Sequence, residues 1–284
     1  MRVVITTRIL PVALGYDAVL RGAGHDPVGV LTIRDTDRYG TEFTADALVR
    51  GLPLDLDLVV PARRSEIAPL LASMRPDLVV CTGFPWKIPP DALAVPPRGW
   101  LNGHPSLLPR HRGPIPMAWA IRNGDAEIGV TFHKMDAGLD TGPILVQERF
   151  PTGEYVEPEE FYGRTGPTVM GAFAAAVEKI AAGDDGTPQA DGGEYESFFG
   201  EADAWLDPSR TASELHRLVW AWRYAVALDG VRGALVDLDG ETVRVLASSL
   251  AEVAGARRLE CADGPLWLVR TEPAQPAPEQ APRS

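Results

Sequence analysis

The amino-terminal half of the chain alternates short apolar runs with amphipathic segments. It begins with the apolar run RVVITT, continues with the helical pattern ALGYDAVLRGAGHDP, in which Gly22 and Gly24 mark the end, and returns to VGVLTIR. A strand at residues 56–60, a helix opened by Ser65 and the buried strand DLVVCTGF repeat the pattern. Because strands that alternate with helices pair in parallel, we expect an α/β fold: an open, mostly parallel sheet with helices on both faces.

The next predicted strand, GWLNGH, ends with two polar side chains, Asn102 and His104. A helix at residues 117–123 and a strand at residues 128–135 follow, and then a loop that carries Asp140. Alternate residues of an extended strand point to the same side, so the side chains of Asn102 and His104 are expected to share one side of this strand. Loops that follow the strands of open α/β sheets are where such folds bind ligands.

The three polar side chains have the chemistry for attack on a carbonyl group. The Asn102 amide can donate to a developing oxyanion, the His104 imidazole can move protons near neutral pH, and the Asp140 carboxylate can orient the imidazole. Each residue also has a purely structural interpretation. Asn102 precedes Gly103 in a turn dipeptide, His104 can be an ordinary loop residue, and Asp140 can cap the next segment.

Several spaced blocks around these residues carry a family resemblance. They are NGHPSLLPRHRG from Asn102, WAI at residues 119–121, GVTFH at residues 129–133 and MDAGLDTGPIL at residues 135–145. In this order they resemble the formyltransferase family that uses 10-formyltetrahydrofolate, and weaker similarity extends from the amino terminus to about residue 230. The resemblance implies a Rossmann-like formyltransferase sheet and an N-formyltransferase whose catalytic residues are Asn102, His104 and Asp140.

The resemblance also implies a site for the 10-formyltetrahydrofolate co-substrate, formed by two loops and the SLLP region. Its candidate residues are Phe84, Trp86, Lys87, Ile88, Arg112, Met135, Asp136, Gly138 and Leu139. Two alternatives stay open, because FPWKIPP can be a rigid loop over the core and Arg112 can belong to a structural ion pair. No metal is expected, since His104, His111 and His133 lack a recognised ligand spacing.

A dinucleotide-binding function is disfavoured by the segment after the first strand. A Rossmann fingerprint needs a glycine-rich turn at that point, so that a pyrophosphate can approach the helix terminus. The segment here is TTRILPVALG, which contains no GxGxxG pattern. The dehydrogenase interpretation therefore loses most of its support.

Beyond residue 150 the sequence changes character. We expect a catalytic domain at 1–183 that ends with a long helix, a polar linker at 184–208, a small domain at 209–272, and a disordered Pro-rich tail at 273–284. The small domain begins with the helical pattern TASELHRLVWAWRYA and continues with DG turns between alternating apolar residues. It is therefore predicted to be mostly β, either OB-like or truncated.

Length, composition and cysteine usage fit a soluble cytoplasmic enzyme. The chain has 284 residues, 45% of them apolar, and no apolar run reaches the ~18 residues needed to span a membrane. The amino terminus lacks the charged start and cleavage site of a secretory signal. The two cysteines, Cys81 and Cys261, give no disulfide framework. The sequence does not indicate an oligomeric state.

Charge bears on the amine acceptor. The chain has 27 Lys and Arg against 39 Asp and Glu, a formal net charge of −12. In the methionyl-tRNA branch of the family, a basic loop and a full carboxyl-terminal barrel hold tRNA. The segment of this chain that corresponds to the loop, IRDTDRYGTEFTADALVRG, is instead rich in carboxylates. The carboxyl-terminal unit is short, and AVALDG stands where the family usually has a PxPG-type block. We therefore expect a small amine acceptor, such as an amino sugar nucleotide, an amino acid derivative or a biosynthetic intermediate.

Three alternatives to this function stay open. The first is methionyl-tRNA formyltransferase, with tRNA as the partner. The second is a 10-formyltetrahydrofolate hydrolase, in which water replaces the amine and the same three residues serve. A binding module without catalysis is disfavoured, because all three polar residues are present.

Overall fold

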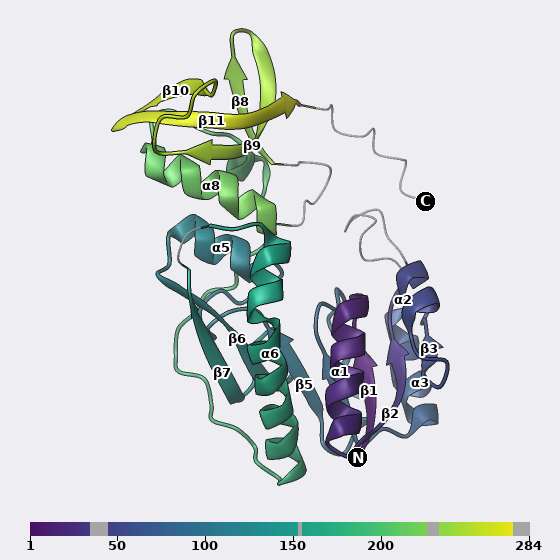
Figure 1. Ribbon diagram of the computed structural model, residues 1–284. Helices are drawn as coiled ribbons and strands as arrows, with labels where there is room; N and C mark the ends of the chain where they lie inside the picture. Colours follow the sequence, from purple (N-terminus) through teal and green to yellow (C-terminus); the bar gives the residue numbers. More distant parts are fainter. Residues whose placement is uncertain (35–44, 153–154, 226–232, 275–284) are drawn as a thin grey trace. The chain divides into compact units, whose positions relative to one another are not determined.

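The computed structural model describes residues 1–34, 45–152, 155–225 and 233–274 (Figure 1). These residues form two compact units. Unit 1 comprises Met1–Arg112, Gly129–Phe150 and Tyr162–Tyr195, and unit 2 comprises Gly113–Ile128, Pro151–Phe161 and the chain from Glu196. Three predicted features lie outside the described residues: the acidic segment at 35–44, most of AVALDG, and the tail from residue 275. The predicted domain boundaries stay a prediction.

Unit 1 is built on a seven-stranded sheet with the order β3-β2-β1-β4-β5-β6-β7. Its first five strands are parallel: β1 (Arg2–Thr6), β2 (Asp26–Leu31), β3 (Asp57–Val59), β4 (Leu78–Cys81) and β5 (Trp100–His104). Strand β6 (Glu127–Lys134) runs antiparallel to β5, and β7 (Ile144–Pro151) follows β6 at the edge of the sheet opposite β3. The predicted open, mostly parallel sheet is confirmed.

Helices cover both faces of this sheet because its strands are apolar on both sides. In β1, Val3 and Ile5 belong to one core cluster with residues of α1 (Leu10–Gly22) and α6 (Pro158–Ala181). Val4, which points the other way, packs in a second cluster with α3 (Ile67–Met74) and α4 (Pro90–Leu93). Figure 1 shows α1 and α6 on one side of the strands. The remaining elements of this unit are α2 (Ala45–Gly51) and the short 3-10 helix η2 (Arg64–Glu66).

Unit 2 contains a four-stranded antiparallel sheet and three helices. The sheet order is β10-β11-β9-β8, with β8 (Ala234–Leu238), β9 (Glu241–Ser249), β10 (Arg257–Cys261) and β11 (Gly264–Pro273). The helices are α5 (Pro116–Asn123), α7 (Glu201–Ala204) and α8 (Ala212–Tyr224). Thr211 and Glu214 form a capping box that starts α8. The predicted small, mostly β carboxyl-terminal domain is confirmed. The dipeptides Asp239–Gly240 and Asp263–Gly264 lie at hairpin turns.

The structure departs from the predicted elements at several places, and the short helices α4 and α7 are among the elements that were not predicted. Helix α3 begins at Ile67, after the 3-10 turn that contains Ser65, and its N-cap residue is Glu66 rather than Ser65. Strand β7 was not predicted, because its half-polar sequence ILVQERFP shows weak periodicity. Strand β11 continues to Pro273, into the segment assigned to the tail. Within the described ranges, no helix combines the length and apolar character needed to cross a membrane.

Candidate active site

Strand β5 and the loop after β6 bring the three predicted catalytic side chains together in unit 1. Asn102 and His104 are alternate residues of β5, so both side chains lie on the same side of the strand. Asp140 Oδ1 lies 3.4 Å from Asn102 Nδ2 and 3.6 Å from His104 Nδ1. His104 is buried, with 5% exposure, and the Asp140 side chain is 18% exposed. The carboxylate is therefore shared between the amide and the imidazole.

A fourth side chain, His133, completes this group. It stands opposite Asn102 in the β5–β6 ladder, and its Nε2 lies 3.1 Å from Asn102 Nδ2. Its Nδ1 lies 2.9 Å from the Lys134 carbonyl oxygen, which can only accept, so Nδ1 carries the proton. Burial, followed by the charge of His104, lowers the pKa of His133 to about 4. His133 is therefore neutral near pH 7, and its Nε2 accepts a hydrogen bond from Asn102.

The same argument fixes the roles of the other atoms. Because His133 Nε2 accepts, the atom of Asn102 that faces it must be the amide nitrogen. The second N–H of that nitrogen donates to Asp140 Oδ1 over 3.4 Å. His104 Nε2 donates to the His111 carbonyl oxygen over 2.9 Å. His104 Nδ1 is therefore the ring nitrogen that can exchange a proton with Asp140 or with a substrate.

The loop that carries Asp140 is closed at its base. Lys134 N donates to the Pro143 carbonyl over 2.9 Å, so the chain leaves β6 and enters β7 at the same point. Gly142 is required there, because a Cβ atom would come 1.8 Å from the Lys134 carbonyl oxygen. Asp140 has a φ of 57°, a left-handed conformation that Asp adopts more readily than most residues. These constraints hold the Asp140 carboxylate close to β5.

Four of the predicted co-substrate residues gather in one apolar cluster of unit 1. Phe84, Trp86 and Met135 are partly buried and pack against the cluster that contains the buried Ile88. The Phe84 and Trp86 rings meet edge to face, with centroids 6.1 Å apart. An aromatic and aliphatic surface of this kind suits a flat heteroaromatic ring, which is the shape of a pterin.

The other predicted co-substrate residues lie outside this apolar cluster, either exposed or in loops held by hydrogen bonds. Lys87 is exposed, and Leu139 has 43% exposure. Asp136 Oδ1 accepts hydrogen bonds from Gly138 N and Thr141 Oγ1, which shapes the loop before Asp140. The Arg112 guanidinium donates to the Gln189 side chain and to the Gly193 carbonyl oxygen. Their contact with the co-substrate stays a prediction.

Sequence reasoning did not select His133 and Gln189. The signal for His133 was its place in a strand that follows the Asn102 strand, where an antiparallel pairing would put the two side chains together. Gln189 lies in the polar segment predicted as a linker, and its side chain donates to the carbonyls of Asp140 and Gly142, each over 2.8 Å. No local periodicity distinguishes that residue.

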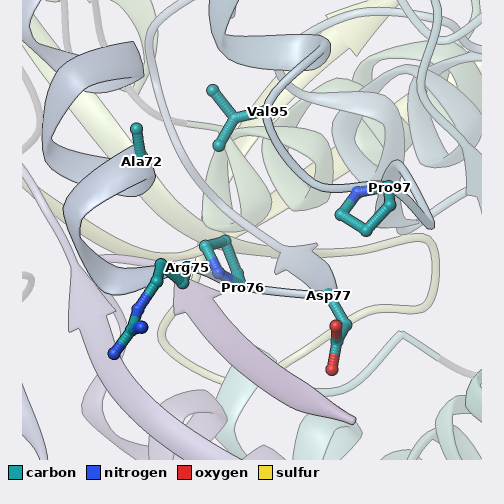
Figure 2. A pocket seen from close by; sticks show the side chains of 6 residues that line it. All are labelled: Ala72, Arg75, Pro76, Asp77, Val95 and Pro97. Atoms are coloured by element: carbon teal, nitrogen blue, oxygen red, sulfur yellow. The ribbon is translucent and has the colours of Figure 1, made fainter.

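A separate cavity of about 480 Å³ lies near the amino-terminal ends of β4 and β5, and Figure 2 shows the residues that line it. Its residues precede β4 and β5, whereas Asn102 and His104 end β5. They are Ala72, Arg75, Pro76, Asp77, Val95 and Pro97. Asp77 already accepts a hydrogen bond from Arg2 N over 2.7 Å. The cavity shares no residue with the catalytic group.

Residues 59–169 match the formyl transferase family. The methionyl-tRNA formyltransferase of Pseudomonas fluorescens (strain SBW25) is 34% identical over 238 residues, which cover 82% of this chain and 73% of that protein. The methionyl-tRNA formyltransferase of Roseiflexus sp. (strain RS-1) is 31% identical over 286 residues, covering 92% and 85%.

Solved structures share the fold at lower identity. A sugar N-formyltransferase from Shewanella sp. FDAARGOS_354 is 19% identical with a TM-score of 0.65, covering 89% of this chain and 99% of that one. HypX from Aquifex aeolicus in complex with tetrahydrofolic acid is 18% identical with a TM-score of 0.67, and the match covers 97% of this chain but 44% of HypX. The chain belongs to the family of 10-formyltetrahydrofolate-dependent N-formyltransferases.

Proposed function

We propose that this chain transfers the formyl group of 10-formyltetrahydrofolate to a primary amine of a small-molecule acceptor, with Asn102, His104 and Asp140 as catalytic residues. The arrangement of polar atoms around Asp140 Oδ1 supports these roles, because a hydrogen-bond donor, a titratable ring nitrogen and a carboxylate converge within 3.6 Å. Such a set can stabilise a tetrahedral oxyanion and move the proton that amine attack releases.

The reaction forms one bond, breaks one bond and moves one proton from the amine to the folate nitrogen by way of Asp140. The neutral amine attacks the formyl carbon. The N–H of Asn102 that faces Asp140 Oδ1 over 3.4 Å donates to the oxyanion instead, a contact typically worth about 3 to 4 kcal/mol in the transition state. Protonated His104 also stabilises this oxyanion, and Asp140 orients the imidazole and accepts the amine proton. When the tetrahedral intermediate collapses, the bond from the formyl carbon to the folate nitrogen breaks, and that nitrogen receives the proton.

The charge of the carboxyl-terminal segment is the observation that favours a small acceptor. Residues 196–274 contain 13 Asp and Glu against 8 Arg, and no Lys. Seven of these Arg residues are described, and six of them lie within 4.0 Å of a carboxylate. The six are Arg210, Arg223, Arg244, Arg257, Arg258 and Arg270. RNA affinity comes largely from cations that contact phosphates, and here carboxylates compete for those cations.

Methionyl-tRNA is the second candidate acceptor. The relatives at 31% to 36% identity are named methionyl-tRNA formyltransferases, and the match to the Roseiflexus protein covers 92% of this chain. These names favour tRNA more directly than they favour a small amine. The charge of residues 196–274 is the opposing argument.

The test is a screen of primary amines with 10-formyltetrahydrofolate, read by mass spectrometry. We expect an amino sugar nucleotide, an amino acid derivative or a related amine to gain the mass of one CO unit. A parallel reaction without amine measures formate, because release of formate at the full rate without any acceptor would identify a hydrolase. If charged initiator tRNA is formylated and no small amine is, the small-molecule proposal is wrong.

A further inference from the structure

Gln189 touches both loops that frame the proposed catalytic group. Its Nε2 donates to the Asp140 and Gly142 carbonyl oxygens, each over 2.8 Å. Its Oε1 accepts from Arg112 Nη2 over 2.8 Å. The side chain is half-buried, and all of its amide atoms are engaged. One amide group therefore connects the loop of Asp140 to the loop that contains Arg112.

The second loop supports His104. Arg112 also donates to the Gly193 carbonyl over 3.2 Å, and Arg112 pairs with Tyr195 through an isolated β-bridge. The residue before Arg112 is His111, whose carbonyl accepts the hydrogen bond from His104 Nε2. Gln189 is thus bonded to the backbone of Asp140 on one side and, through Arg112, to the loop that holds His104 on the other.

We propose that Gln189 is a positioning residue that sets the separation of His104 and Asp140. This inference rests on the proposed catalytic roles of those two residues. Asp140 has a positive φ, which costs free energy in a non-glycine residue unless neighbouring contacts stabilise it. The two hydrogen bonds from Gln189 supply such contacts on both sides of Thr141. A misplacement of a catalytic group by about 1 Å can reduce a rate about 100-fold. The hydrogen bonds that hold the Asp140 loop in place are therefore expected to affect turnover.

The discriminating variant is Gln189→Glu. A glutamate has the same shape and can still pair with Arg112, but it has no N–H group to donate to the Asp140 and Gly142 carbonyls. We expect Gln189→Glu and Gln189→Ala to lower kcat about 10-fold to 100-fold, with the KM for 10-formyltetrahydrofolate changed less than twofold. If Gln189 only anchors Arg112, Gln189→Glu would keep the kcat of the unmodified protein.

Arg98→Met is the matched control. Arg98 Nη1 also donates to two carbonyls of unit 1, those of Ile180 and Ala181, but it precedes β5 and lies away from Asp140. We expect this variant to keep the kcat of the unmodified protein. Turnover of all variants is followed as tetrahydrofolate release in the presence of the amine that the unmodified protein uses.

Asp140→Asn separates failure of this inference from failure of the proposed function. If Asp140→Asn is inactive and Gln189→Glu has a kcat within twofold of the unmodified protein, Gln189 does not position the site. If Asp140→Asn is fully active, the catalytic assignment itself is wrong. A low kcat for Gln189→Glu, an unchanged KM and full folding by circular dichroism would support the inference.

Discussion

Asn102 and His133 face each other across neighbouring antiparallel strands, and the His133 ring fixes the orientation of the Asn102 amide. The Nδ2 atom of Asn102 lies 3.1 Å from Nε2 of His133. Since His133 Nδ1 must donate to the Lys134 carbonyl, its Nε2 is an acceptor and Asn102 must present N–H groups on this side. Strand pairing thereby orients the donor that the proposed mechanism needs.

Replacement of His133 tests that orientation. We expect His133→Phe to lower kcat about 10-fold, because the amide of Asn102 loses its acceptor and can rotate. His133→Gln keeps a side-chain oxygen that can accept, and it should retain more activity than His133→Phe. Steady-state kinetics with both variants give the measurement. Equal kcat values for the unmodified protein and His133→Phe would show that the histidine does not orient Asn102.

The lowered pKa of His133 implies that the stability of the protein depends on pH. Its pKa falls from 6.5 to about 4 on folding, so the unfolded chain binds this proton more readily than the folded one. The stabilising contribution of neutral His133 to the free energy of unfolding is present above pH 6.5 and is lost as the pH falls from 6.5 to about 4. Denaturant unfolding of His133→Gln over that range should show a weaker pH dependence. An unchanged pH dependence would contradict the assignment.

The three proposed catalytic residues should behave as one unit. We expect Asn102→Ala, His104→Ala and Asp140→Ala each to abolish most formyl transfer and to leave the fold intact, as judged by circular dichroism. Because groups that act together are non-additive, the double variants should be scarcely slower than the single ones. A His104→Ala variant with near-normal turnover would be incompatible with the proposed mechanism.

Gly142 offers a test of the loop that carries Asp140. A Cβ atom at this position would come 1.8 Å from the Lys134 carbonyl oxygen, so Gly142→Ala must displace the loop. We expect a loss of activity and a destabilisation of about 1 to 3 kcal/mol, measured by denaturant unfolding. Gly163→Ala in helix α6 is the control, because its Cβ meets nothing within 4 Å and Ala favours helices by about 1 kcal/mol.

Much of the fold could be predicted from local patterns. The apolar runs and amphipathic segments of unit 1 correspond to β1 through β6 and to the main helices, and the DG dipeptides predicted both hairpins of unit 2. Alternation along β5 correctly predicted that Asn102 and His104 share a side. Strand β7 was missed because partly polar edge strands have little periodicity.

The rest of the site depends on contacts between distant segments. His133 became part of it through strand pairing, and Gln189 through hydrogen bonds to a loop 49 residues earlier in the chain. The contacts of Gln189 leave no mark in the local sequence, and the pairing of His133 with Asn102 is indicated only by the succession of the two strands. The sequence allows Arg112 to be a ligand contact or part of an ion pair, and the structure shows hydrogen bonds from Arg112 to Gln189 and Gly193. Its role toward the co-substrate stays a prediction.

The acceptor is tested most directly by comparing kcat/KM for initiator methionyl-tRNA and for the best small primary amine, with 10-formyltetrahydrofolate as donor, at low and at physiological salt. We predict a higher kcat/KM for the small amine at both salt concentrations. Formylation of the tRNA should be slow even at low salt, because carboxylates compete with phosphates for the arginines of residues 196–274. Tight, salt-sensitive binding of the tRNA, with faster formylation than any small amine, would contradict the account.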